Sequence, residues 1–292
     1  MTVSISLVGR SDAPRMVAAL QDWARPDCYA AGFHVGDLGW HLRLDDDQVE
    51  GSILCVEDGA EIVATGIVEG SHSLYSAIKP GRLYDVQLAE ALTELVDAAP
   101  STHEIHVEAA PQSAFRSVLS GRGWLIDPAA WVVLYRNLTA ADAVPADELA
   151  SPLTSESDIA DRVVIQRSAF KGSTFTVRRW HQMAASPGYD AALDLIRRNE
   201  AGQAVAAATG WSAGPGKCGI LEPVGTHADH IGAGHGRAVT SGVIAALAQA
   251  GASGVAVHTP ASNLAAVTTY ERCGMRQVEL THAMLRPAES SD

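Results

Sequence analysis

The most informative part of this sequence is the stretch Thr226-His-Ala-Asp-His-Ile-Gly232-Ala-Gly234-His-Gly236-Arg237. It follows an apolar segment, Cys218 to Thr226, that predicts a strand. It precedes a helix from about Arg237 to Ala250, whose apolar residues recur at three- and four-residue intervals. A glycine-rich turn at a helix N-terminus leaves backbone N–H groups unpaired, and the helix dipole adds partial positive charge there. The loop therefore predicts an anion site suited to a pyrophosphate, with an ordinary tight turn as the alternative.

Two other phosphate-binding patterns are missing from the sequence. It contains no GxxxxGK[ST] motif, and no GxGxxG with an acidic residue about 20 positions further on. Nucleoside triphosphate and dinucleotide sites are therefore disfavoured.

A second patterned segment lies downstream, Asn263-Leu-Ala-Ala-Val-Thr-Thr-Tyr270-Glu-Arg-Cys-Gly-Met275. Together the two segments resemble two motifs of the GNAT acetyltransferase superfamily, Gln/Arg-x-x-Gly-x-Gly/Ala and Asn-x-x-Ala-x-x-x-Tyr-x-x-x-Gly-Phe, in the family's order and spacing. The resemblance covers residues 153 to 285 well. It implies an acetyl-CoA-dependent N-acetyltransferase without a metal, whose acceptor is a primary amine of a small molecule.

The sequence departs from the first motif at two positions. Ile231 stands where the family usually has Gln or Arg, and Ala233 stands where a second basic residue is common. Arg237, in the first helical turn, is a candidate for the missing charge, and a solvated surface arginine is the alternative. The resemblance assigns cofactor contacts to Val224, Gly225, Thr226, Gly232, Ala233, Gly234, His235, Gly236, Arg237, Asn263 and Tyr270. For Asn263, an ordinary helix N-cap is the alternative.

The resemblance also implies direct attack of the amine on the thioester, with three residues in named roles. Tyr270 matches the family's general acid, and a phenol pKa of about 10 lies close enough to that of a thiol, about 8.5, for proton transfer. Glu222 is the candidate base, with a structural acid or an ammonium anchor as alternatives. The backbone N–H of Val224 is the candidate oxyanion donor, because Pro223 and Gly225 favour an irregular strand.

Other side chains near these motifs have simpler explanations. His227, His230 and His235 cluster around the loop without the pattern of a zinc site, so we expect no metal. The aromatic residues Trp180, Trp211 and Tyr189 are candidates for an acceptor pocket, although core packing is more usual. The four cysteines, Cys28, Cys55, Cys218 and Cys273, have no regular spacing and predict reduced thiols.

The two halves of the chain repeat the same order of elements. Each contains a hairpin signal (residues 53–63 and 193–205), then an amphipathic helix (86–98 and 237–250), then a β-rich run (103–107 and 254–258). We expect an α/β (α+β) protein with tandem folds, each a mixed, mostly antiparallel twisted sheet flanked by helices. The predicted domains are residues 1–140 and 152–292, joined by a polar linker at about 141–151.

The first half repeats the elements around the site but lacks the residues of its two motifs. Ile78-Lys-Pro-Gly-Arg-Leu-Tyr-Asp85 occupies the place of the glycine loop, Leu119 that of Tyr270, and Gln112 that of Asn263. This predicts a degenerate copy that stabilises the pair and walls off one side of the acceptor site.

The overall composition and charge indicate which classes of binding partner the protein favours. The 292 residues are 47% hydrophobic and carry a formal charge of −13, which disfavours nucleic acid and anionic membranes and suits a cationic or neutral substrate. We expect a cytoplasmic monomer or homodimer acting on an aminoglycoside-like or other cationic metabolite. Mycothiol-synthase-like acetylation of a cysteinyl amine and a non-catalytic acyl-CoA-binding module remain open.

Overall fold

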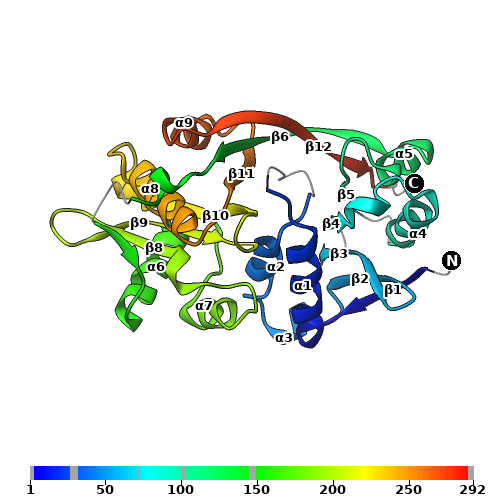
Figure 1. Ribbon diagram of the computed structural model, residues 1–292, viewed down its shortest axis with the longest axis horizontal. Coiled ribbons are helices and arrows are strands. Elements are labelled where there is room, and N and C mark those ends of the chain that lie inside the picture. The colour runs from blue at the N-terminus through cyan, green and yellow to red at the C-terminus, as the bar shows by residue number, and fades with distance from the viewer. Residues whose placement is uncertain (1–2, 27–31, 71–72, 100–102, 145–148, 289–292) are drawn as a thin grey trace.

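The computed structural model describes residues 3–26, 32–70, 73–99, 103–144 and 149–288. Its strands form one mixed, mostly antiparallel twisted sheet in the order β1-β2-β3-β4-β5-β12-β6-β11-β10-β9-β8-β7 (Figure 1). The strands are β1 (Val3–Val8), β2 (Ile53–Asp58), β3 (Glu61–Glu69), β4 (Ser73–Ile78), β5 (Ile105–Glu108), β6 (Leu125–Asn137), β7 (Ala150–Pro152), β8 (Asp194–Arg198), β9 (Ala204–Trp211), β10 (Cys218–Thr226), β11 (Gly254–Pro260) and β12 (Arg276–Arg286).

The helices pack on this sheet where the apolar periodicity predicts them. The two predicted amphipathic helices are α4 and α8, and α8 begins two residues earlier than expected. The described helices are α1 (Ala13–Trp23), α2 (Val35–His41), α3 (Asp46–Val49), α4 (Val86–Asp97), α5 (Ala114–Gly121), α6 (Glu156–Ala169), α7 (Val177–Ala184), α8 (His235–Gln249) and α9 (Leu264–Arg272). In the described part of the chain, none of them is long and apolar enough to cross a membrane.

The predicted internal repeat is present, with an exchange of strands at its end. The order β2-β3-β4-α4-β5-α5-β6 in the first half recurs as β8-β9-β10-α8-β11-α9-β12 in the second. However, β6 pairs with β11 of the second half, and β12 pairs with β5 of the first. Figure 1 shows β6 and β12 running side by side across the top of the molecule, between the two halves.

Buried side chains anchor the exchanged strands. Leu134 of β6 is fully buried in the core under α8 and α9, while Met284 of β12 is fully buried in the core under α4 and α5. The proposed boundaries at residues 140 and 152 therefore separate the repeats in sequence, whereas the final strand of each repeat completes the other's sheet. Within the predicted linker, residues 145–148 lie outside the described residues, and β7 begins at Ala150.

Each half contains one short parallel pair of strands. In the second half β10 pairs with β11 only from Cys218–Gly254 to Ile220–Ala256, and in the first half β4 pairs with β5 only from Ser73–His106 to Tyr75–Glu108. Beyond these residues each pair diverges. The sheet therefore opens between β10 and β11, and this opening positions the candidate site.

Helix α2 of the first half packs directly on β9 of the second. A Cβ added to Gly36 or Gly39 would lie 2.5 or 2.3 Å from the ring of Trp211. Since any larger residue at these positions would collide with the indole, the two glycines allow α2 to lie against β9 and close to β10.

Candidate active site

The glycine loop leaves an open, electropositive helix end. Gly232 and Gly234 have φ of 85° and 82°, a region that favours glycine, and Gly234 is the N-cap of α8 without any side-chain cap. The first backbone hydrogen bond of α8 runs from the Ala238 N–H to the Gly234 carbonyl, 3.0 Å. Earlier amides therefore have no partner within the helix, and a Cβ at Gly232 or Gly234 would meet nothing within 4 Å. This geometry fits a bound pyrophosphate.

The predicted side chains of the loop are placed on its surface. Ile231, Ala233 and Arg237 are exposed, and the exposed fraction of Ile231 is 71%. The two residues that depart from the family motif, Ile231 and Ala233, are therefore not buried in the loop. The ring centroid of His230 lies 5.8 Å from that of His227 and 6.1 Å from that of His235. No group of three His, Cys, Asp or Glu side chains suited to a metal occurs in the described ranges.

Sequence reasoning missed one cation at this loop. Arg197, at the end of β8, places Nη1 2.9 Å from Nδ1 of His235, the first residue of α8. Because a guanidinium only donates, His235 accepts through Nδ1 and carries its ring proton on Nε2. Packing of α8 against β8 brings these two residues together from 38 positions apart, which no local sequence pattern reveals.

The N–H of Val224 faces the opening in the sheet. The His227 N–H donates to the Val205 carbonyl, 2.9 Å, so in this antiparallel ladder His227–Val205 and Gly225–Ala207 are hydrogen-bonded pairs. Alternation makes Val224–Ala208 a pair without hydrogen bonds, whose N–H and C=O groups point away from β9. On that side, the recorded pairing with β11 ends at Ile220.

Tyr270 and Asn263 are placed by α9. Tyr270 is only 7% exposed, and burial, followed by the charges of Cys273 and Glu222, raises the pKa of its phenol. The phenol therefore stays protonated, and no hydrogen-bond partner for its hydroxyl is found among the described residues. Asn263 caps α9, because its Oδ1 accepts from the Ala266 N–H at 3.2 Å, which is the simpler of the two roles considered.

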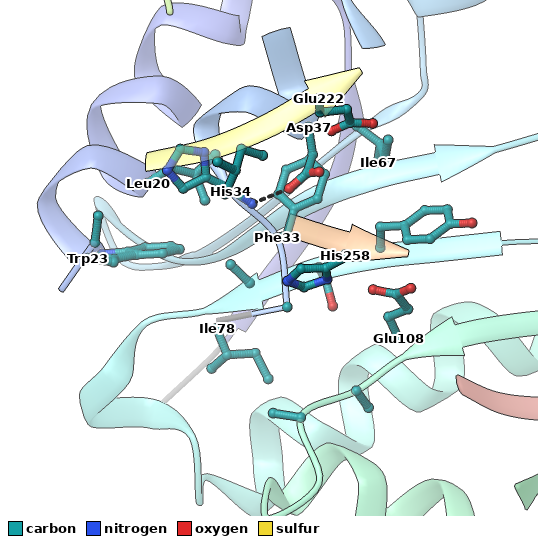
Figure 2. A pocket seen from close by; sticks show the side chains of 18 of the residues that line it. Leu20, Trp23, Phe33, His34, Asp37, Ile67, Ile78, Glu108, Glu222 and His258 are labelled. Carbon is teal, nitrogen blue, oxygen red and sulfur yellow. Dashed lines mark hydrogen bonds between the residues drawn. The ribbon is translucent and has the colours of Figure 1, made fainter. Parts of the chain in front are cut away.

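Glu222 lies in a cavity of about 530 Å³ that both halves line. Opposite it stands Asp37 of α2, and Figure 2 shows the two carboxylates close together. Burial, and then the charge of Asp37 and a hydrogen bond to it, raise the pKa of Glu222 well above its ordinary value. Burial, followed by Asp37, also raises the pKa of Glu108 to about 7.

A hydrogen bond from the N-cap of α2 holds the first half against β10 of the second. Nδ1 of His34 accepts from the Gly36 N–H at 3.0 Å, so its Nε2–H donates to the Cys218 carbonyl at 3.2 Å. Within the second half, the indole of Trp211, on which α2 packs, donates to the Glu222 carbonyl at 2.7 Å. Asp37 therefore faces Glu222 because of the fold of both halves, and sequence reasoning on the second half alone missed it.

The aromatic residues suggested for an acceptor pocket belong to the core instead. Trp211 is 1% exposed beneath α2, and Trp180 and Tyr189 both donate to the buried carboxylate of Asp194. None of the three is among the cavity-lining residues of the described chain. Cys55, Cys218 and Cys273 are buried and form no disulfide within the described ranges, and Cys28 lies outside the described residues.

Comparison with known proteins gives a family match for part of the second half and a fold for the whole chain. Residues 166–275 match the model of the acetyltransferase (GNAT) family. A GCN5-related N-acetyltransferase from Sphaerobacter thermophilus is 21% identical over 99% of this chain and 96% of its own, with a TM-score of 0.57. A tandem GNAT protein from the clavulanic acid biosynthesis pathway is 13% identical over the full length of both chains, with a TM-score of 0.59.

A GNAT-family acetyltransferase from Colwellia psychrerythraea aligns over 98% of each chain at 11% identity, with a TM-score of 0.57. A search of curated proteins gives no match. At these identities the solved structures show the fold, which is that of tandem GNAT proteins over the whole chain.

Proposed function

We propose that this protein, whose residues 166–275 match the GNAT acetyltransferase family, transfers an acetyl group from acetyl-CoA to a primary amine of a small cationic molecule. The GNAT fold supports acyl-CoA-dependent acetyl transfer in general. The acceptor class follows from the carboxylates that line the cavity beside the opening in the sheet.

The cofactor site is assigned to the opening of α8 and the strand before it. Backbone amides from Gly232 to Arg237 would hold the pyrophosphate, and Arg197 adds positive charge beside them. Residues 224–226 would pair with the extended arm through the unpaired edge of β10. When bound, acetyl-CoA supplies a thioester carbonyl carbon that an amine can attack.

In this proposal, a residue of this chain assists each step of the transfer. The attacking amine loses a proton towards Glu222, its nitrogen forms a bond to the carbonyl carbon, and the carbon–sulfur bond breaks. The Val224 N–H donates to the oxyanion that develops on the carbonyl oxygen. Tyr270 supplies a proton to the departing thiolate.

One observation carries this proposal. The Val224 N–H faces the place where β10 and β11 separate, and Glu222 and Tyr270 are near enough to that opening for the charge of Glu222 to raise the pKa of the Tyr270 phenol. A donor, a base and an acid therefore converge where the fold leaves backbone groups unpaired.

Deprotonating the amine is the costly step, and the cavity is suited to it. An alkylammonium with a pKa of about 10.4 is neutral in roughly one molecule per thousand or fewer at neutral pH. An ammonium group between Asp37 and Glu222 would favour ionisation of Glu222, which then becomes able to accept the proton.

Release of free CoA in the presence of a panel of small amines tests this function. We expect amine-dependent release that follows saturation kinetics. Tight acetyl-CoA binding without release by any amine would instead support the non-catalytic acyl-CoA-binding module. Release only with cysteinyl amines would support the mycothiol-synthase-like alternative.

A further inference from the structure

The cavity has two chemically different ends. Figure 2 shows Glu222, Asp37 and Glu108 towards one side, with Leu20 and Trp23 towards the other and Phe33 and Ile78 between them. The first half of the chain contributes all of these residues except Glu222. The degenerate half therefore provides most of the wall of the proposed acceptor site.

The acidic end is built to hold a cation. Asp37 disfavours the charged forms of Glu108 and Glu222, because it raises the pKa of both glutamates after burial has done so. Glu69 lines the same cavity, and Arg43 offsets part of the negative charge, lowering the pKa of Glu222. One ammonium group at this end would relieve the repulsion between the carboxylates.

The other end is lined mainly by apolar side chains, with His34 beside Leu20 (Figure 2). Leu20, Trp23 and Phe33 are each less than 8% exposed and belong to the first-half core, so only small parts of these side chains face the cavity. Ile78 continues this wall along β4, whereas Ile67 lies beside Glu222 (Figure 2). Arg25, two residues after Trp23, also lines the cavity.

We propose, resting on the function proposed above, that the acceptor is a primary amine carried on an apolar aryl or alkyl body, and that the first half selects it. The ammonium group binds between Asp37, Glu108 and Glu222. The apolar body lies along Phe33 and Ile78 towards Trp23.

A polycation fits this cavity poorly. A second ammonium group several ångströms from the first would lie among apolar side chains and near Arg25, without a carboxylate partner. Burying an unpaired charge in such surroundings costs several kcal/mol. A volume of about 530 Å³ is within the usual range for a small-molecule site, so a compact amphipathic amine fills it.

A homologous series of amines tests the inference on the intact protein. We expect kcat/KM to rise about fourfold for each methylene from ethylamine to hexylamine, the equivalent of about 0.8 kcal/mol per buried CH₂. Phenethylamine should exceed ethylamine at least tenfold, and spermidine should be the poorest substrate. A flat series, or a preference for spermidine, would overturn the inference.

Substitution of one wall residue locates the selectivity in the first half. Ile78→Thr keeps a β-branched residue in β4, and we expect it to lower the ratio of kcat/KM for hexylamine to that for ethylamine about fivefold or more. Ile62→Thr, at another partly buried strand position of the first half that does not line the cavity, is the matched control and should leave the ratio unchanged. An unchanged ratio in Ile78→Thr would contradict the assignment.

Binding measured without turnover separates this inference from the function on which it rests. Trp23, Trp40 and Trp131 line the cavity, so their fluorescence reports amine binding directly. Binding that strengthens from ethylamine to hexylamine without CoA release would contradict the proposed function and support the apolar preference. CoA release with no dependence of binding or turnover on chain length would contradict the preference alone.

Discussion

The helices α4 and α8 occupy equivalent places in the two halves, yet their N-termini are satisfied in different ways. At α4, Asp85 accepts from the Gln87 and Leu88 N–H groups at 3.0 and 3.1 Å, and Arg82 pairs with that carboxylate. At α8, Gly234 provides no side chain at all. The first half has filled its anion site with its own carboxylate, whereas the second has left its site open to a ligand.

The two halves also differ in the side chains at the positions of the proposed base and acid. The parallel pairing ends at Tyr75 on β4 and at Ile220 on β10. Two residues further along each strand, at equivalent positions, β4 has Ala77 and β10 has Glu222. In the helix that follows the next strand, Leu119 is fully buried where the other half has Tyr270. The first half therefore forms this fold without these side chains, and we expect those of the second half to serve function.

Tyr270→Phe tests the largest difference between the halves. Removing the proposed proton donor for the thiolate should lower kcat about 100-fold or more, while the Kd for acetyl-CoA changes little. Steady-state kinetics and calorimetric titration measure the two quantities. Tyr84→Phe, at a 69% exposed tyrosine of the first-half loop, is the control. Unchanged kcat in Tyr270→Phe would remove the acid assignment.

Gly234→Asp gives α8 the kind of cap that α4 has. The new carboxylate would occupy the helix N-terminus and repel a pyrophosphate, so we expect the Kd for acetyl-CoA to rise about 30-fold, or roughly 2 kcal/mol. Gly234→Asn has similar tolerance of positive φ and similar capping ability without the charge, and should weaken binding much less. Equal effects of the two variants would show that backbone strain, not charge, causes the loss.

Glu222→Gln tests the carboxylate that the first half lacks at this position. The raised pKa of Glu222 means that the base becomes ionised only as the pH rises above the ordinary glutamate range. We therefore expect wild-type kcat/KM to increase with pH, and the variant to lose about tenfold at the alkaline end and little at the acidic end. Glu61→Gln, at an exposed position of β3, is the control. A uniform loss across the pH range would indicate an anchoring role.

Asp85→Ala should have the smallest effect, and on stability alone. Loss of the cap should lower the free energy of unfolding near neutral pH by about 1 kcal/mol. The hydrogen bond from Leu88 N–H is the largest of the interactions that lower the pKa of Asp85. Its contribution is therefore present above the ordinary aspartate pKa and lost as the pH falls through the folded value. Denaturant unfolding at neutral and acidic pH measures this, and an equal loss at both would contradict it.

Local patterns in the sequence were enough for the elements and for half of the site. The hairpins, α4, α8 and β10 follow from periodicity and turn residues, and the glycine loop and Tyr270 follow from the two motifs. The exchange of β6 and β12 could not be predicted, because both repeats have the same order of elements whether or not they exchange strands. Arg197 and Asp37 were missed for a related reason, since each reaches the site only through strand pairing or helix packing between distant segments.

Calorimetric titration of the intact chain with acetyl-CoA tests the contrast between the halves most directly. With the α4 terminus capped by Asp85 and the α8 terminus open, binding should saturate at about one molecule per chain. Gly234→Asp should weaken that single site, and Asp85→Ala should leave the stoichiometry unchanged. Two equivalent sites per chain, or one site that is insensitive to Gly234→Asp, would contradict the account.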